Sequence, residues 1–249
     1  MPVFTSAAAV SSLALALGLL AVPFARAQTP DGPTFAPQSA AAVVVKVPKP
    51  WYAPKSLVVS RMRETVPQYS ALPGLAHKAF SLAQSDARYG GIYLWKDEAA
   101  ARTFFGPAWH QRVEKERGAT AQVQFFEVPV AIDNATGGSV DTAAVGTLVT
   151  LAVPVGITKA RLRQEFEAAI PIYQKVPGLL RKYFILSEDG RFGGIYLWQD
   201  SGSAQRWFNH AWTERVLKTY GAPATIEWFD TPILLPSTLA DNKPAIPGL

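Results

Sequence analysis

The sequence contains no cysteine, and only three of its 249 residues are histidine. Without cysteine the chain forms no disulfide, offers no thiolate nucleophile and has no lipid-attachment site. The histidines (His77, His110 and His210) stand too far apart for a metal-ligand pattern, so we expect no metal. G-x-S-x-G, P-loop and G-x-G-x-x-G motifs are also missing, which leaves acyl-enzyme and nucleotide chemistry without support. We therefore expect no cofactor.

Charge is neither dense nor clustered. The formal net charge is +5, and the 24 basic residues are scattered along the chain without a Lys/Arg block. A scattered excess is typical of a solvated surface and not of a nucleic-acid-binding face, so we expect no nucleic-acid partner. The hydrophobic content of 49% is enough for two modest cores.

The N-terminus has the pattern of an export signal. Residues 7–22 are apolar and small, and Ala25-Arg26-Ala27 fits an A-x-A cleavage site. We predict a signal peptide over residues 1–27 and a periplasmic or secreted protein that has no membrane contact after cleavage. The apolar run is short and rich in alanine for a spanning helix.

An internal repeat is the sharpest signal in the chain. The octet RYGGIYLW at 88–95 returns as RFGGIYLW at 191–198, with seven identities in eight at an offset of 103 (191 − 88). Upstream the offset is 104, where Tyr69 aligns with Tyr173 and Lys78 with Lys182. Two copies of about ninety residues are too long for a solenoid repeat and suit two small domains.

Each copy predicts strand–helix–strand–strand–helix–strand, the order of a ferredoxin-like unit. Since such a unit leaves one sheet face bare, we expect the two copies to bury these faces against each other. The predicted fold is α+β, two tandem ferredoxin-like units packed as an intramolecular dimeric α/β barrel. The predicted ranges are a flexible lead at 28–40, unit 1 at 41–130, a linker at 131–146, unit 2 at 147–235 and a tail at 236–249.

The ends of the helices also follow from the sequence. We predict helices over 55–69 and 158–173, with Thr158 as an N-cap. A proline near the last turn of each, Pro67 or Pro171, should kink or end the helix. A further helix in each copy follows Asp97 or Asp200 and stops at Gly118 or Gly221.

Alternation in the octet separates two sets of side chains. Ile92 and Leu94 face one side of the strand and Tyr93 and Trp95 the other, and the second copy repeats this with Tyr196 and Trp198. Tyrosine and tryptophan suit a pocket wall, whereas aromatic residues at strand spacing also pack cores and interfaces. The paired glycines leave room for a ligand or another backbone, or mark a bulge. Six aromatic residues are the ligand-pocket candidates: Tyr93, Trp95, Trp109, Tyr196, Trp198 and Trp212.

The octet, the following aspartate and the ending WFDTP at 228–232 resemble the YdhR-like monooxygenases of the dimeric α/β-barrel superfamily, which includes antibiotic-biosynthesis monooxygenases. The resemblance covers both copies and is better in the second. It implies a cavity between sheet and helices in each unit and oxygenation of an aromatic substrate anion without metal or flavin. Haem-degrading members use an Asn, a Trp and a His, and the first strands here (43–47 and 147–153) contain no Asn.

No catalytic residue follows from the sequence. His110 and His210 fit half-exposed polar positions better than catalytic ones. The matched acids Glu127 and Asp230 could act as bases or could cap turns and pair with lysine or arginine. We expect an exported, cofactor-independent monooxygenase that acts on an aromatic or ionisable small organic molecule. The alternatives are a non-catalytic binding or stress-related protein for a hydrophobic ligand, and a purely structural barrel; association between copies of the chain stays open.

Overall fold

A computed structural model describes residues 40–135 and 145–235. The predicted signal peptide, nearly all of the lead, most of the linker and the tail lie outside these residues. In the first half the elements are β1 (Ala40–Pro48), α2 (Lys55–Glu64), α3 (Val66–Ser70), β2 (Leu75–Ala83), β3 (Arg88–Trp95), α4 (Glu98–Phe104), α5 (Pro107–Arg117) and β4 (Gln122–Asp133). In the second half they are β5 (Val145–Ala152), α6 (Lys159–Tyr173), β6 (Leu179–Leu186), β7 (Arg191–Trp198), α7 (Ser201–Trp207), α8 (His210–Tyr220) and β8 (Thr225–Leu234).

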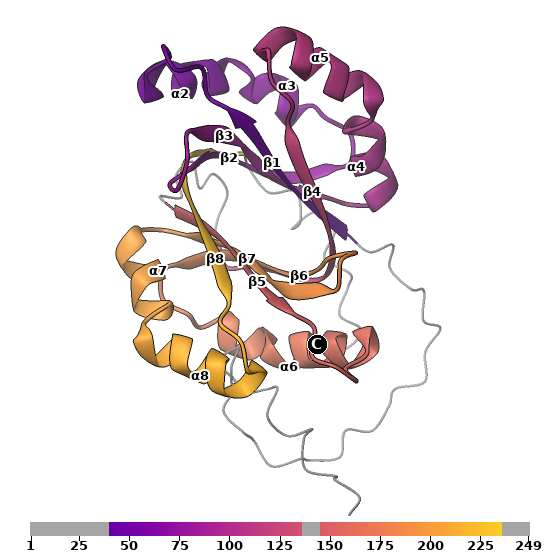
Figure 1. Cartoon of the computed structure of the whole chain (residues 1–249), viewed down its shortest axis with the longest axis vertical. Helices are drawn as coiled ribbons and strands as arrows, with labels where there is room; N and C mark the ends of the chain where they lie inside the picture. The colour runs from indigo at the N-terminus through magenta and orange to yellow at the C-terminus, as the bar shows by residue number, and fades with distance from the viewer. Residues whose placement is uncertain (1–39, 136–144, 236–249) are drawn as a thin grey trace, which may run out of the picture.

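The eight strands form one closed antiparallel barrel in the order β1-β3-β2-β8-β5-β7-β6-β4. Each half contributes four neighbouring strands, and the halves join where β2 pairs with β8 and β4 pairs with β6. The helices of the first half cover one side of the strands and those of the second half cover the opposite side (Figure 1).

Three apolar cores follow from this arrangement. One lies inside the barrel and takes residues from both halves, Ile92, Leu94, Ile195 and Leu197 among them. The other two lie between the strands and the helices of each half. The two faces predicted from alternation in the octet are therefore confirmed: the aliphatic residues point into the barrel and the aromatic residues toward the helices.

The predicted helix ends are confirmed by their hydrogen bonds. Asp97 and Asp200 accept from the amides of Ala100 and Ser203, both at 2.7 Å, and Thr158 accepts from Arg161 at 3.2 Å. Gly118 and Gly221 end α5 and α8 in the left-handed conformation, which glycine adopts without a Cβ penalty.

Several boundaries differ from the prediction. The single helix expected after Asp97, and again after Asp200, is two helices in each half, because Pro107 begins α5 and Asn209 caps α8. The helix expected over 55–69 is interrupted near Pro67, as predicted: it ends at Thr65, and Pro67 lies in the first turn of a new helix, α3, where its missing N–H costs nothing. In the second half Pro171 stays inside α6, which runs on to Tyr173. The expected linker 131–146 is shorter, since β4 continues through Asp133 beside β6 and β5 begins at Val145.

Candidate active site

All six predicted pocket residues lie beneath the helices, three in each half. Tyr93, Trp95 and Trp109 belong to the core of the first half; Tyr196, Trp198 and Trp212 belong to that of the second. Phe105 lies between Tyr93 and Trp109, with ring centres 5.1 and 5.0 Å away. Phe208 repeats this contact between Tyr196 and Trp212 at 5.2 and 5.0 Å. The packing thus brings the matched aromatic residues together within each half, and all six side chains are buried.

A lysine lies at the centre of each aromatic group. Lys78 on β2 places its Nζ 2.9 Å from the ring centre of Tyr69, 3.8 Å from that of Phe80 and 4.6 Å from that of Tyr93. We call these four residues the first lysine cage.

The second lysine cage repeats this arrangement with matched residues. Lys182 on β6 has its Nζ 4.0 Å from the ring centre of Tyr173, 4.1 Å from that of Phe184 and 3.7 Å from that of Tyr196. The residue Lys182 is 0% exposed.

Each cage holds a pair of neighbouring tyrosines. The ring centres of Tyr69 and Tyr93 lie 5.9 Å apart in the first cage, and those of Tyr173 and Tyr196 lie 6.1 Å apart in the second. Burial is the main cause that raises the pKa of Tyr93 and of Tyr173 well above the ordinary tyrosine value. These phenols are therefore neutral donors and acceptors at physiological pH.

The two glycines of each octet have different neighbours: the first lies against the backbone of the adjacent strand and the second against side chains of the cage. A Cβ on Gly90 or Gly193 would lie 2.0 Å from the carbonyl oxygen of Val45 or Val149, so the first glycine lets two strands approach. A Cβ on Gly194 would lie 2.7 Å from Lys182 Nζ, and one on Gly91 would lie 3.1 Å from Lys78 Cε. The Tyr93 and Tyr196 rings also lie 2.9 Å from these Cβ positions, so the second glycine of each pair makes space for the lysine and the tyrosine of its cage.

Burial makes both lysines weaker bases than an exposed lysine. Burial lowers the pKa of Lys78 and of Lys182 well below the ordinary lysine value. Cation–π contact with the rings favours the charged form, but it is worth about 2 kcal/mol when desolvated. Desolvation of an ammonium without an anionic partner costs several kcal/mol and outweighs it.

Several buried donors around the cages have no acceptor among the described residues. They are Lys182 Nζ, Trp95 Nε1, Trp207 Nε1 and Trp212 Nε1. Trp198 differs, because its Nε1 donates to Thr147 Oγ1 at 3.3 Å. Buried donors without acceptors are costly, so the spaces between sheet and helices suit a molecule that carries oxygen acceptors.

The sequence prediction missed the lysine cages, although their signal was present. Lys78 and Lys182 are matched across the repeat and occupy the same strand face as Phe80 and Phe184. A polar residue at an inward-facing position of both copies marks a site more sharply than the aromatic residues beside it.

The other candidate acids and histidines have structural contacts. Glu127 on β4 pairs with Lys159, 3.6 Å away, and with Arg163, while Asp230 on β8 pairs with Lys55. Each acid thus contacts a helix of the opposite half. Of the roles considered for these acids, the structure shows the ion pair with lysine or arginine. His210 is exposed and lies 3.6 Å from Glu214, and His110 is exposed as well.

His77 occupies a different place, buried next to the barrel core. Its Nδ1 forms a 3.0 Å hydrogen bond with the hydroxyl of Tyr183, from the other half. Burial, followed by the charge of Arg181, lowers the pKa of His77 well below its ordinary value, so the ring is neutral. Within the described residues no group of acids and histidines could hold a metal ion.

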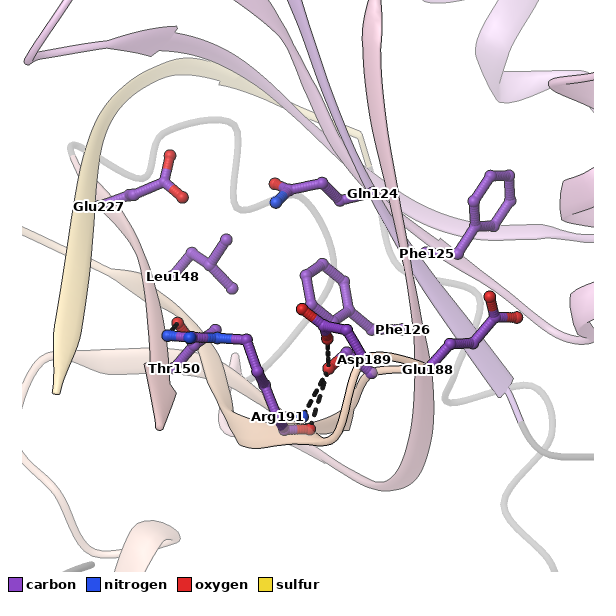
Figure 2. A pocket seen from close by; sticks show the side chains of 10 residues that line it. Gln124, Phe125, Phe126, Leu148, Thr150, Glu188, Asp189, Arg191 and Glu227 are labelled. Atoms are coloured by element: carbon purple, nitrogen blue, oxygen red, sulfur yellow. Dashed lines mark hydrogen bonds between the residues drawn. The ribbon is translucent and has the colours of Figure 1, made fainter. Parts of the chain in front are cut away.

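One pocket lies at a mouth of the barrel and not in a cage. It has a volume of about 250 Å³ and is lined by polar groups, Thr150, Glu188, Arg191 and Glu227 among them (Figure 2). Arg191 donates to Thr150 Oγ1 at 2.7 Å across its floor. None of the six predicted aromatic residues lines it or a second pocket of about 360 Å³ beside Gln174.

The first half of the chain resembles a known protein family. Residues 45–139 match the family model of the putative mono-oxygenase ydhR. The resemblance inferred from the octet is thereby confirmed, although the match falls in the first half and not in the second, where the sequence favoured it. No curated protein sequence matches the chain.

Three solved structures share the fold of this chain at 11–12% identity. A putative monooxygenase from Fusobacterium nucleatum has a TM-score of 0.58 and covers 79% of this chain and 94% of its own. A putative monooxygenase from Lactobacillus acidophilus has a TM-score of 0.52 and covers 79% of this chain and 96% of its own. An anthrone oxidase-like protein has a TM-score of 0.50 and covers 81% of this chain and 94% of its own. At this identity they establish the fold alone. None of the described helices is long and apolar enough to cross a membrane.

Proposed function

We propose that this chain is a cofactor-independent monooxygenase that acts on an aromatic or otherwise ionisable small organic molecule. The match of residues 45–139 to a monooxygenase family carries the proposal, because that stretch contains the whole first lysine cage. The fold shared with the three structures is consistent with it.

The chemistry of the cages suits such a substrate. Aromatic walls bind a flat apolar ring system, and indole N–H groups without acceptors can donate to its oxygen atoms. Tyrosine hydroxyls and the lysine amine supply further polar contacts in an otherwise apolar site.

Oxygen uptake tests the proposal. We would measure oxygen consumption by the full chain with an anthrone and with a quinol, alongside quenching of tryptophan fluorescence. Trp95→Ala and Trp198→Ala should weaken quenching and slow uptake, whereas Trp51→Ala, at a position 92% exposed, should change neither. Absence of uptake with every substrate would refute the oxygenase.

A second function is a binding protein for a hydrophobic ligand. It is favoured by the closure of both cages by aromatic packing, which leaves the described pockets elsewhere. Saturable quenching without oxygen uptake would support it, and absence of both would support a purely structural barrel.

We also propose that the two halves are ferredoxin-like units packed as an internal counterpart of a dimer. The strand order of each half and the two joining pairs, β2–β8 and β4–β6, support this arrangement. Size-exclusion chromatography with light scattering should give the mass of a single chain.

Export through residues 1–27 is a further proposal, supported by the A-x-A pattern at 25–27. Expression in a bacterial host should yield a periplasmic protein that begins at Gln28. Mass spectrometry of the intact protein would contradict export if residues 1–27 were retained in the periplasmic fraction or the protein stayed in the cytoplasm.

A further inference from the structure

We propose that a lysine in each half, Lys182 in the second and Lys78 in the first, is the base that takes the proton from the substrate. This rests on the proposed oxygenase function and supplies the catalytic group that neither the motifs nor the histidines provide.

The position of the amine favours this role. Lys182 Nζ points among the rings of Tyr173, Phe184 and Tyr196 and has no hydrogen-bond partner among the described residues. A buried amine without an acceptor costs stability compared with a methyl group in the same place. The same arrangement occurs twice, and both times a glycine on the neighbouring strand makes space for it.

The surroundings keep the amine able to accept a proton. The titratable groups that face Lys182 are Tyr173 from α6 and Tyr196 from β7, and those facing Lys78 are Tyr69 from α3 and Tyr93 from β3. No carboxylate or other charged group contributes to the lowered pKa of either lysine, for which burial is the cause. Burial thus favours the free amine, whose lone pair can accept a proton, and the surrounding rings stabilise the ammonium once it forms.

The reaction can be written for a substrate with an acidic methylene between aromatic rings. The amine takes one proton, breaking a C–H bond and leaving a carbanion conjugated with the rings. The carbanion reduces dioxygen by stepwise electron transfer and forms a C–O bond, giving a peroxide anion. The ammonium then returns its proton to that anion.

The hydroperoxide breaks down without further help from an oxidant. Loss of the second C–H proton and cleavage of the O–O bond give the carbonyl and hydroxide. The released proton and the hydroxide combine as water. The balance is R₂CH₂ + O₂ → R₂C=O + H₂O, so carbon is oxidised, dioxygen is reduced and the lysine is regenerated as a free amine. A substrate of this size must displace part of the aromatic packing around the lysine as it enters.

A nitrophenol probe separates the proton transfer from the oxygenation, because its phenolate absorbs visible light and the phenol does not. Bound below the pKa of the free phenol, it should appear as phenolate on the wild-type protein. Lys182→Met and Lys78→Met should each reduce this signal, and the double variant should abolish it while the phenol still quenches fluorescence. Lys96→Met, on the exposed residue after β3, is the control and should behave as wild type.

Oxygen uptake with an anthrone completes the test. The double variant should lose about 100-fold in rate, the usual contribution of general base catalysis. Lys182→Arg combined with Lys78→Arg should lose as much, since arginine stays protonated, and it provides a second test if the methionine variants do not fold. Folded double variants that keep the wild-type rate and phenolate signal would overturn the lysine base. A wild-type protein that forms phenolate without oxygen uptake would overturn the oxygenase and support the lysine as proton acceptor, whereas one that does neither would overturn both.

Discussion

In the second half the indole of Trp198 donates to Thr147, whereas in the first half Val43 stands at the equivalent place and the Trp95 indole has no acceptor among the described residues. The rings of Tyr196 and Trp198 are nearly parallel, 7° apart. The two lysines also differ in their nearest ring. Lys78 Nζ lies 2.9 Å from the ring centre of Tyr69, whereas Lys182 Nζ comes closest to Tyr196, at 3.7 Å. The same plan is therefore built with different polar contacts, and the difference shows which features both halves require: the lysine, the tyrosine pair and the two glycines.

The glycines should give the largest effect. Gly193→Ala places a Cβ 2.0 Å from the carbonyl oxygen of Val149, so we expect a loss of about 3 kcal/mol in the free energy of unfolding. Gly90→Ala should cost as much in the first half. Gly156→Ala, where nothing lies within 4 Å but φ is +84°, should cost about 1 kcal/mol. Urea unfolding measures all three, and equal losses would contradict the close-approach explanation.

Removing a lysine should stabilise the protein. Lys182→Met replaces an unpartnered amine by an apolar group of similar shape, and we expect a gain of about 2 kcal/mol at neutral pH. Lys78→Met should gain less, because its amine lies closer to an aromatic ring centre. Thermal and urea unfolding at pH 7 would test the order, and destabilisation by both changes would indicate that the amines hold the cages together.

The pH dependence of stability follows from the same residues. Because both lysines have a folded pKa below the ordinary 10.5, the unfolded chain binds more protons between the folded pKa and 10.5. Stability should therefore rise with pH in this window, by at most about 1.4 kcal/mol per pH unit for each lysine. Urea unfolding from about pH 8 to 9.5 stays below the range in which tyrosine ionises in the unfolded chain. The double methionine variant should lack this slope, and an unchanged slope would assign it to other groups.

The smallest effect should come from the threonine that distinguishes the halves. Thr147→Val removes the acceptor of Trp198 Nε1 and should cost about 1 kcal/mol. In the first half, Val43→Thr should give Trp95 Nε1 the missing acceptor and raise the free energy of unfolding by less than that amount. A double-mutant cycle with Trp198→Phe would show whether the cost arises from this hydrogen bond.

Local patterns predicted much of this fold. The repeat defined both halves, alternation assigned the faces of the octet, and Asp97, Asp200 and Thr158 marked helix starts through a single side-chain bond each. The break at Thr65 was not predictable from periodicity, because Val58, Met62 and Val66 keep a four-residue spacing across it.

The site was harder to predict because it depends on long-range packing. The sequence placed the aromatic residues on the correct face, but the closeness of Lys182 to Tyr173 and Tyr196 arises from three elements that meet only in the folded chain. Sequence alone shows that a residue is lysine. Whether its amine is removed from solvent depends on how these three elements pack in the folded chain.

The residues at 77 and 181 show that two halves joined in one chain can carry different residues at equivalent positions. They occupy equivalent positions of the repeat, yet one is His77, bonded to Tyr183, and the other is Arg181, bonded to Asp133. Arg181 lies near enough to His77 to lower its pKa. Two identical subunits would bring arginine against arginine or histidine against histidine at this place. One chain that carries both halves can instead change each position independently, so a substitution on one side of the barrel need not be tolerated on the other.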